Sequence, residues 1–286
     1  MKMVDDVEII EIMNKEDWVN YISSFKAKIR RSAELELIRS PYPASLPGVC
    51  GCCGKLQNMS FGTWHSRLTE RGGIELALSE TGSCPECRIN SRMRFASDVL
   101  RSYFSETRGS IYLTECKTNF FTALSKIRHP LVGSEFLGSD RTPGEKYDGI
   151  THQDVTNLTY QDSSFQGVVC LDVLEHVHDP LAAVLELHRV LSSGGVGIVT
   201  FPFFPYQEKT VVRCRIKDDG TVEHFLPAVY HGNPLGGGAL VFSELSWDFL
   251  DRVKKNLGNC CQLINYWSLY RCHFGMHRFA LILSKK

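Results

Sequence analysis

The sequence predicts an α/β fold in which a parallel sheet with crossover helices follows a smaller N-terminal module. From Ile111 onward, short apolar runs alternate with amphipathic segments, which is the pattern of strands joined by helices. Residues 50–94, in contrast, are rich in cysteine, glycine and polar residues, so that segment can form little core of its own. With 286 residues, the chain is long enough for a medium domain with a smaller attachment.

The N-terminal segment predicts one long helix followed by a linker. Between residues 15 and 39, apolar residues such as Trp18 and Phe25 recur at helical spacing. Residues 41–48 contain three prolines, which end the helix and are typical of a linker. We therefore expect residues 1–48 to form a helix and a linker.

Four apolar runs predict the buried strands of the sheet. They cover residues 111–115, 131–138, 167–173 and 196–201. Between the last two runs, residues 180–195 predict an amphipathic helix that two glycines end. The remaining elements are a helix over 244–257 and a C-terminal antiparallel hairpin of two strands, 263–267 and 278–284. We expect residues 96–286 to form one domain, with residues 204–242 inserted as a lid over the strand ends.

Charge and hydropathy exclude several classes of protein. Lys and Arg together number 32, as do Asp and Glu, so the formal net charge is zero. Nucleic-acid-binding proteins usually carry a net basic surface, so we do not expect a nucleic-acid partner. The longest apolar run, residues 194–204, is about half the roughly 20 residues that span a bilayer. The N-terminus lacks the pattern of a signal peptide. We expect a cytoplasmic protein without a membrane partner, and the oligomeric state stays open.

Five of the eleven cysteines lie in a cluster whose spacing is typical of a zinc site. Cys50 and Cys53 form one Cys-x-x-Cys pair, and Cys84 and Cys87 form a second pair 30 residues further on. Each pair can present two thiolates on one tight turn, and two such turns complete a tetrahedral shell for zinc. Four sulfur ligands leave no open position for water, so we expect a structural site within residues 49–95. Cys52 is a surplus thiol that could compete with Cys50 or Cys53.

Acidic residues follow the predicted strands at the edge where ligands bind in an open parallel sheet. Glu115, Glu135 and Asp172 stand at strand ends, and Asp154 lies in the loop after Ile150. Carboxylates in this arrangement suit a ligand that offers ribose hydroxyls, an exocyclic amine and a cationic group.

The segment 154–203, with its Asp-x-x-Glu-His strand ending and Gly-Gly turn, resembles the class I S-adenosylmethionine-dependent methyltransferases. The resemblance covers roughly residues 111–286. The two Cys-x-x-Cys pairs, INSRMR (89–94), GSEFLG (133–138) and YHGNP (230–234) are similar to a bacterial branch with an N-terminal zinc knuckle. The resemblance implies a Rossmann-like sheet and S-adenosylmethionine as cofactor.

The resemblance also implies roles for individual residues. Glu135 would hold the ribose hydroxyls, Asp154 the adenine amine, and Asp172 would lie near the methionine moiety. Phe136 and Val155, which directly follow two of these acids, are assigned to the same cofactor site.

One segment departs from the family pattern. The glycine-rich loop after the first strand is replaced by TECKTNFF (114–121), which places Glu115, Lys117 and Asn119 at the glycine positions. Those glycines normally let the backbone approach the cofactor closely. As a hypothesis, Lys117 pairs with the cofactor carboxylate and Glu115 with its amine. The alternative is a degenerate methyltransferase that no longer binds the cofactor.

Three histidines are candidate bases for an oxygen acceptor. His176 follows the acidic strand ending, and His224 and His231 lie in the insertion. A base near the acceptor hydroxyl assists transfer, and histidine is the common choice at neutral pH. The competing interpretations are a structural residue at a helix start for His176 and loop hydrogen bonding for the other two.

The sequence therefore favours S-adenosylmethionine-dependent methyl transfer to a small-molecule or sugar-containing acceptor, at oxygen. One alternative is a nucleic-acid methyltransferase that uses the basic residues near the zinc module: Arg88, Arg92, Arg94 and Arg101. The other is a zinc-bearing scaffold protein, without catalysis, on a degenerate methyltransferase fold.

Overall fold

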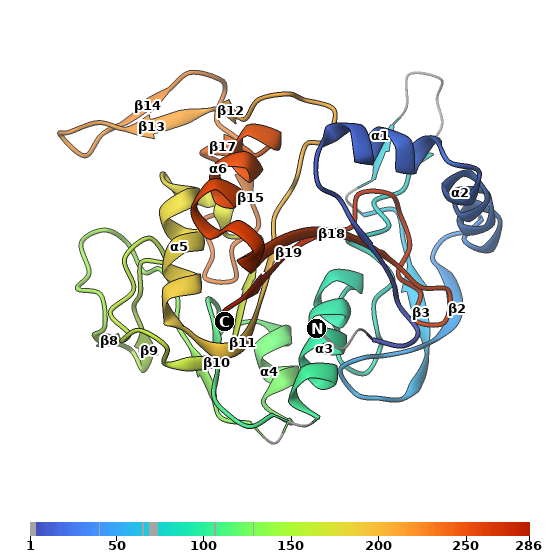
Figure 1. Cartoon of the computed structure of the whole chain (residues 1–286), viewed down its shortest axis with the longest axis horizontal. Helices are drawn as coiled ribbons and strands as arrows, with labels where there is room; N and C mark the ends of the chain where they lie inside the picture. The colour runs from blue at the N-terminus through green and yellow to red at the C-terminus, as the bar shows by residue number, and fades with distance from the viewer. Residues whose placement is uncertain (1–3, 40, 65, 69–73, 106, 128) are drawn as a thin grey trace. The chain divides into compact units, whose positions relative to one another are not determined.

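A computed structural model describes residues 4–39, 41–64, 66–68, 74–105, 107–127 and 129–286. Figure 1 labels the helices and strands of the chain. The chain divides into two compact units. Unit 1 contains residues 1–107 and 264–278, and unit 2 contains residues 108–263 and 279–286.

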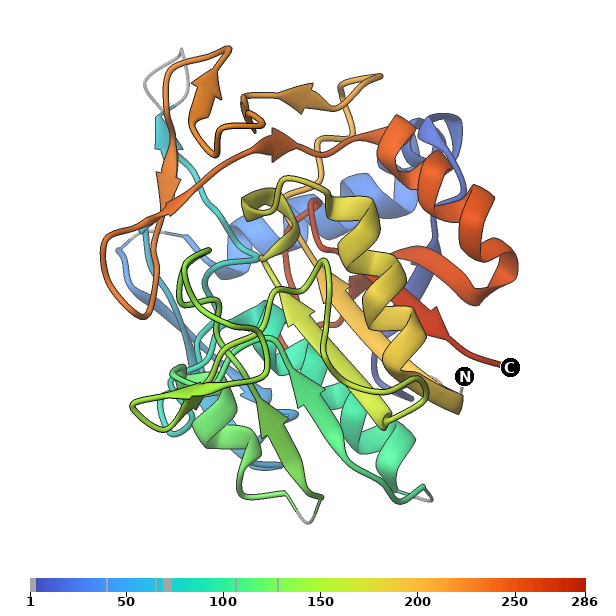
Figure 2. The ribbon, with the colours of Figure 1, turned by 90° about the vertical axis from the view of Figure 1, so that its left-hand side faces the viewer.

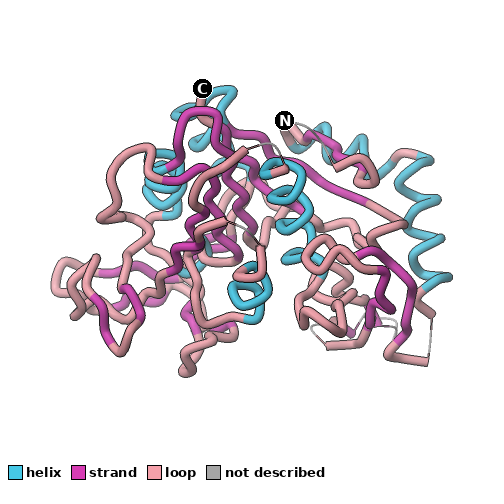
Figure 3. The backbone as a smooth tube through the Cα atoms, turned by 90° about the horizontal axis from the view of Figure 1, so that it is seen from below, coloured by secondary structure: helices cyan, strands magenta, loops and turns pink. Residues whose placement is uncertain are grey.

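The sheet of the α/β fold contains parallel strands at its centre, as predicted. Its four parallel strands are β6 (Ile111–Leu113), β7 (Leu131–Gly133), β10 (Phe165–Leu171) and β11 (Leu191–Thr200). The C-terminal strand β19 (Phe279–Ser284) pairs antiparallel with β11. The strand order of the seven-stranded sheet is β1-β18-β19-β11-β10-β6-β7. Figure 3 colours the strands magenta and the helices cyan. The Rossmann-like fold class predicted from the sequence is confirmed.

Helices cover the apolar strands of unit 2. They are α4 (Asn119–Leu124), α5 (Pro180–Val190) and α6 (Trp247–Leu257), with 3-10 turns η1 (Leu174–His176) and η2 (Gly258–Cys260). Figure 2 shows α5, in yellow, running across the central strands. Its buried residues Ala183, Val184 and Leu187 recur at helical spacing, which is why this segment forms an amphipathic helix. Asp179 caps its N-terminus by accepting hydrogen bonds from the amides of residues 181 and 182.

Two expected boundaries in unit 2 are wrong. The helix predicted over 180–195 ends at Val190, and the glycines lie in the turn that leads into the parallel part of β11. Gly194 has a φ of +71°, so it supplies the left-handed backbone of that turn. The strand predicted over 131–138 ends at Gly133, because the chain then turns at the edge of the sheet.

The insertion of unit 2 consists of short ribbons. Its pairs are β12 (Val211–Val212) with β17 (Ser243–Glu244), β13 (Cys214–Ile216) with β14 (Val222–His224), and β15 (Tyr230–His231) with β16 (Ala239–Leu240). Before the insertion, β8 (Lys146–Tyr147) and β9 (Ile150–Thr151) form a further ribbon. Much of this insertion is exposed, so backbone pairing rather than a core holds it.

Unit 1 combines helices with small ribbons. Its helices are α1 (Lys15–Ser23), α2 (Phe25–Leu37) and α3 (Ser91–Phe104). Its ribbons are β2 (Ala44–Val49) with β3 (Leu56–Phe61) and β4 (Arg67–Leu68) with β5 (Ile74–Glu75). Strand β1 (Glu8–Glu11) pairs antiparallel with β18 (Cys261–Trp267). Among the described residues, no helix is long and apolar enough to cross a membrane.

Two expectations for the start of the chain are wrong. The single helix predicted over 15–39 is broken at Ser24, whose extended backbone (ψ 150°) ends α1. The Ser24 hydroxyl then caps α2 by accepting a hydrogen bond from the Ala27 amide. As a result, Phe25 is 79% exposed instead of buried. The predicted linker over 41–48 is also structured, since β2 begins at Ala44.

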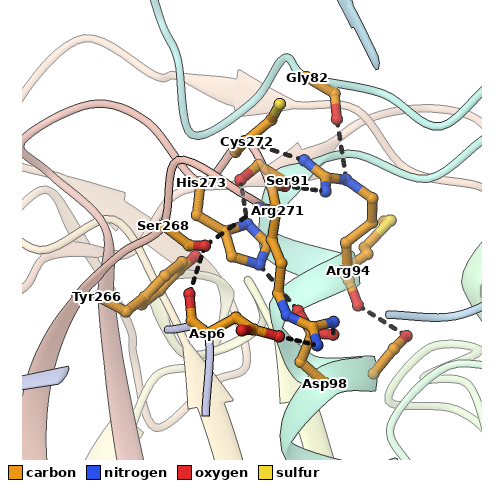
Figure 4. A network of polar contacts seen from close by, with 12 residues as sticks. Asp6, Gly82, Ser91, Arg94, Asp98, Tyr266, Ser268, Arg271, Cys272 and His273 are labelled. Atoms are coloured by element: carbon orange, nitrogen blue, oxygen red, sulfur yellow. Dashed lines mark hydrogen bonds and ion pairs between the residues drawn. The ribbon is translucent and has the colours of Figure 1, made fainter. Parts of the chain in front are cut away.

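A buried polar network in unit 1 joins α3 to residues 268–273 (Figure 4). The Asp98 carboxylate accepts from Arg271 and from His273 Nε2, the latter at 2.9 Å. His273 Nδ1 is then left to accept the Ser91 hydroxyl, also at 2.9 Å. Arg94 donates to the carbonyls of Gly82 and Cys272. Both ring nitrogens of His273 are thus hydrogen-bonded within unit 1.

Burial gives this network a structural role. Ser91 and His273 are 0% exposed and Asp98 is 3% exposed, so their Ser-His-Asp order offers no nucleophile to a substrate. Burial lowers the pKa of His273 well below its ordinary value, and the neighbouring Arg94 adds to this effect. Burial likewise raises the pKa of Asp98 to about 7, against the opposing effect of Arg271.

Candidate cofactor and acceptor site

The ends of the parallel strands meet at one edge of the unit 2 sheet. Leu113 on β6 lies opposite Gly133 on β7 and Val169 on β10, and Leu171 lies opposite Thr200. The predicted cofactor residues Glu115, Glu135 and Asp172 come directly after these strand ends. The parallel register therefore brings the three acids to the same edge, as the sequence pattern predicted.

Glu135 links two neighbouring loops at this edge. Its Oε1 accepts hydrogen bonds from the backbone amides of Cys116 at 2.7 Å and Lys117 at 2.9 Å. The residue is 8% exposed, and its own amide donates to the Thr151 carbonyl. One carboxylate oxygen thus holds the loop that follows β6, where the sequence resemblance places a glycine-rich loop.

The backbone of this loop explains how it tolerates side chains where glycines are expected. None of residues 114–121 has a positive φ, so glycine's conformational freedom is not required there. Lys117 and Asn119 are exposed, and Glu115 is half-buried. Asn119 is already the first residue of α4, which Thr118 caps by accepting from the Phe121 amide at 3.1 Å. A glycine is instead needed for close packing at Gly133, where an added Cβ would stand 2.8 Å from the Glu115 carbonyl oxygen.

Asp154 and Val155 lie in the loop between β9 and β10. Asp154 Oδ1 accepts from the amide of Thr156 at 2.9 Å and from its hydroxyl at 2.7 Å, which fixes the turn. Val155 is buried. Phe136 is 56% exposed, and its ring lies 5.3 Å from that of His152. An exposed aromatic ring beside the strand edge is available to a flat ligand.

Asp172 has an unusual backbone at the end of β10. Its φ is +53°, a conformation that aspartate tolerates better than most residues. The Thr200 hydroxyl donates to its Oδ1 at 3.0 Å, and its amide donates to the Thr200 carbonyl. Such strain is concentrated at functional sites in other proteins.

Two of the three candidate histidines lie together, and the third does not. The rings of His176 on η1 and His231 on β15 have their centroids 5.0 Å apart. Glu175 lies against both, with its Oε1 3.5 Å from His176 Nε2 and 3.5 Å from His231 Nδ1. His224 lies on the exposed ribbon strand β14, outside this cluster.

Glu175 is the site residue that sequence reasoning missed. It is 1% exposed, and burial raises its pKa against the opposing effect of His231, with the charge of Asp172 acting in the same direction as burial. The signal was its position, directly before His176 and three residues after Asp172. The sequence did not indicate that His231 approaches it from the insertion.

The four predicted zinc ligands converge in unit 1. The sulfur atoms of Cys50, Cys53, Cys84 and Cys87 lie within 4.8 Å of one another, and those of Cys50 and Cys87 are 4.0 Å apart. Tetrahedral zinc with bonds of about 2.3 Å requires sulfur–sulfur distances of about 3.8 Å, which this arrangement approaches. The surplus Cys52 is buried and lies outside the group of four.

Both cysteine pairs sit on the same kind of turn. In the first, the amide of Gly54 donates to the Cys50 carbonyl, and in the second the amide of Arg88 donates to the Cys84 carbonyl. The residue after each pair is left-handed, with φ of +72° at Gly54 and +57° at Arg88. Glu86 connects the two turns by accepting from Lys55 and Gln57, each at 2.8 Å. The four thiols fit a metal ion with tetrahedral coordination and no open position.

Comparison with known proteins finds a family similar to part of unit 2. Residues 134–199 match the family model described as a methyltransferase domain. The match begins one residue before Glu135 and includes Asp154, Asp172, Glu175 and His176. This part of unit 2 is therefore similar to a methyltransferase domain. A search of curated proteins found no significant match.

Solved structures similar to this chain include three with low sequence identity. The sugar N-methyltransferase KedS8 from Streptoalloteichus sp ATCC 53650 is 16% identical with a TM-score of 0.43, over 68% of this chain and 87% of that chain. The amino pentose methyltransferase CalS10 from Micromonospora echinaspora, with SAM bound, is 16% identical with a TM-score of 0.42, over 70% and 94%. The PH0226 protein from Pyrococcus horikoshii OT3 is 16% identical with a TM-score of 0.42, over 68% and 90%.

Proposed function

We propose that the methyltransferase domain transfers the methyl group of S-adenosylmethionine to an oxygen atom of a small-molecule or sugar-containing acceptor. The observation that carries the proposal is the position of Glu135 and Asp172, within the matched residues and at the strand edge where such domains bind ligands. When bound, the cofactor supplies a sulfonium methyl that is already activated. The protein's task is then to hold the acceptor in line with that methyl, and alignment alone contributes several kcal/mol.

In this proposal each acid at the edge takes one part of the cofactor. Glu135 uses Oε1 for the loop amides, and its second oxygen would accept from a ribose hydroxyl. Asp154 would accept from the adenine amine, with Phe136 and Val155 against the adenine ring. Asp172, three residues before Glu175, would lie near the methionine end.

The loop that replaces the glycine-rich segment is compatible with cofactor binding. The exposed side chain of Lys117 is available to the cofactor carboxylate, and the half-buried Glu115 to the amine. Because Lys117 donates its backbone amide to Glu135, substitution of its side chain should leave the loop in place. Lys117→Ala with reduced cofactor affinity and unchanged stability would support the role of this side chain.

The acceptor end of the site contains His176 and His231, which we propose to assist removal of the acceptor proton. His224 is the third candidate base, and its exposed ribbon would have to approach the edge to act. His176 Nδ1 lies 2.9 Å from the Leu240 carbonyl, so its Nε2 carries the lone pair when the ring is neutral. That nitrogen is the one beside Glu175.

The contacts of the arginines near the cysteine cluster favour a small acceptor over a nucleic acid. Arg94 is fully buried and donates to backbone carbonyls. Arg92 pairs with Glu80 at 2.7 Å, and Arg101 donates to the Cys52 carbonyl. These three guanidinium groups therefore stabilise unit 1 and are not arranged as a phosphate-binding surface.

We further propose that Cys50, Cys53, Cys84 and Cys87 bind one structural zinc ion. Residues 50–55 and 84–89 form two turns with little apolar core between them, so a closed ion would contribute to folding directly. Metal analysis of the purified protein should give one zinc per chain from this site.

Calorimetric titration tests the function. S-adenosylhomocysteine should bind with one site per chain, and Glu135→Gln and Asp154→Asn should each weaken it at least about tenfold, while the exposed Asp140→Asn should not. Absence of binding to the wild-type protein would instead support the scaffold alternative. The acceptor atom is tested with matched sugars that differ by a hydroxyl or an amine at one position. Faster methyl transfer to the amine would refute the assignment to oxygen.

A further inference from the structure

We propose that Glu175, His176 and His231 form a binding site for a divalent transition-metal cation, separate from the cysteine cluster. One ligand atom from each residue lies within 4.8 Å of the others. Two imidazole nitrogens and one carboxylate are a ligand set that suits Zn²⁺, Fe²⁺, Co²⁺ or Mn²⁺. Three protein ligands leave coordination positions open, unlike the closed set of four cysteines.

The carboxylate at the centre of the cluster is buried and accepts no hydrogen bond from the part of the chain that the structure describes. The side chain of Glu175 is 2% exposed, and neither of its oxygens accepts a hydrogen bond from the described residues. His176 Nε2 and His231 Nδ1 each lie 3.5 Å from its Oε1, which is longer than an ordinary N–H···O hydrogen bond. Leaving a carboxylate buried and unsatisfied is costly, so a group that satisfies it is expected here. A cation between the three residues would do so.

The hydrogen bond of His176 prepares its ring for a metal. A carbonyl oxygen can only accept, so the contact with Leu240 places the ring proton on Nδ1. The Nε2 lone pair of the neutral ring then faces the oxygen of Glu175, and two acceptors repel unless a proton or a cation lies between them. Metal-binding histidines usually donate their second N–H to a carbonyl or carboxylate in this way.

The backbone holds the three residues together from two segments. Glu175 and His176 lie on η1, directly after β10, whereas His231 comes from the ribbon strand β15 of the insertion. The amide of Phe242 donates to the Glu175 carbonyl at 2.8 Å, which attaches the end of the insertion to η1. The ligands are thus brought together by backbone hydrogen bonds that do not involve the ligand atoms.

The position of the site gives the cation a role that rests on the proposed function. Asp172, proposed to lie near the methionine moiety, is three residues before Glu175, and its charge acts on Glu175. The His231 side chain is 42% exposed, so an acceptor can reach the open positions. A cation there would bind the acceptor hydroxyl and lower its pKa.

The transfer step balances with this assignment. The acceptor oxygen loses its proton to solvent and forms a bond to the methyl carbon. The carbon–sulfur bond breaks, and its electron pair stays on sulfur, which changes from a sulfonium to a neutral thioether. In this arrangement His176 and His231 act on the proton through the cation and do not accept it themselves.

Cobalt titration tests the site without reference to activity. Protein that holds one equivalent of zinc, enough for the cysteine cluster alone, is titrated with Co²⁺, and binding is followed by calorimetry and by visible absorption. We expect one equivalent of Co²⁺ to bind and to give cobalt ligand-field bands. A thiolate-to-cobalt charge-transfer band should be absent, because that band would indicate binding to the cysteine cluster. His231→Ala and Glu175→Gln should weaken binding at least about tenfold, whereas His224→Ala, on the same insertion, should bind as the wild type does.

Several results would overturn the proposal. They are an absence of Co²⁺ binding by protein that holds one equivalent of zinc, a cobalt spectrum with a thiolate band only, or equal affinity in wild type and His231→Ala. The exposure of His231 makes that variant safe for folding, and circular dichroism checks both variants. Titration with S-adenosylhomocysteine separates the two proposals: cofactor binding without cobalt binding refutes the metal site alone, and the reverse refutes the cofactor site alone.

Discussion

Truncation of Glu135 should destabilise unit 2 even without cofactor, because its carboxylate organises the loop after β6. Each backbone bond to Oε1, at 2.7 and 2.9 Å, is a hydrogen bond to a charged group, worth about 1.5–3 kcal/mol. Cys116 is half-buried and Lys117 is exposed, so water can replace part of that energy once the carboxylate is removed. We therefore expect Glu135→Ala to lower the free energy of unfolding by about 2–4 kcal/mol.

The isosteric variant separates loop support from cofactor binding. Glu135→Gln keeps an oxygen that can accept both amides, so we expect a loss of only about 1 kcal/mol. Its affinity for S-adenosylhomocysteine should nevertheless fall, since the charge that would bind the ribose is gone. Urea unfolding of both variants, followed by circular dichroism, measures the difference. Asp140→Ala, whose side chain is 77% exposed, is the control. Equal stability losses in the two Glu135 variants, or wild-type stability of Glu135→Ala, would refute the reasoning.

Three further predictions concern the zinc site, pH dependence and a turn. Cys87→Ser should lose the zinc ion and unfold at lower urea concentration; retention of one zinc per chain would show another ligand set. The folded-state pKa of Asp98 is raised to about 7, so its contribution to stability is present below pH 3.8 and lost as the pH rises through 7. As the pH falls from about 7 to about 4, the free energy of unfolding of the wild type should therefore rise relative to that of Asp98→Asn by up to about 1.4 kcal/mol per pH unit. Urea unfolding that gives the same stability difference between the two proteins at every pH would contradict this. Gly149 has a φ of +79° and open space around an added Cβ, so Gly149→Ala should cost about 1 kcal/mol by thermal unfolding through backbone strain alone. A loss above about 3 kcal/mol would indicate a side-chain clash instead.

The three proposed sites differ in how far apart in the sequence their residues lie. The zinc site and the cofactor site depend on residues that come directly after short turns or strands. The metal site at Glu175 depends in addition on a residue of the insertion, His231, more than 50 residues away in the sequence. The residues of this metal site are therefore brought together only by the tertiary structure.

Local pattern alone determined the strands of the sheet, the order of its acids and the cysteine pairs. Alternation of apolar runs and amphipathic segments is a property of neighbouring residues, so it indicates strands and helices before any packing is known. The two Cys-x-x-Cys pairs are likewise local, because each places two thiols on one turn. Parallel register then requires Glu115, Glu135 and Asp172 to share an edge once the strands pair.

Helix boundaries were less predictable, because they depend on caps that compete with hydrophobic spacing. Apolar periodicity continues through Ser24, yet its hydroxyl bonds the following helix and its extended backbone ends the preceding one. The exposure of Phe25 follows from that break.

Only the tertiary structure decided which distant polar groups meet. Asp98 and His273 are 175 residues apart, and no periodicity links them, yet burial makes their pairing necessary for both. In the same way, nothing local indicates that His231 lies against Glu175. Local sequence specifies what each turn or strand can present, whereas the partner of a buried charge is set by the packing that removes water from it.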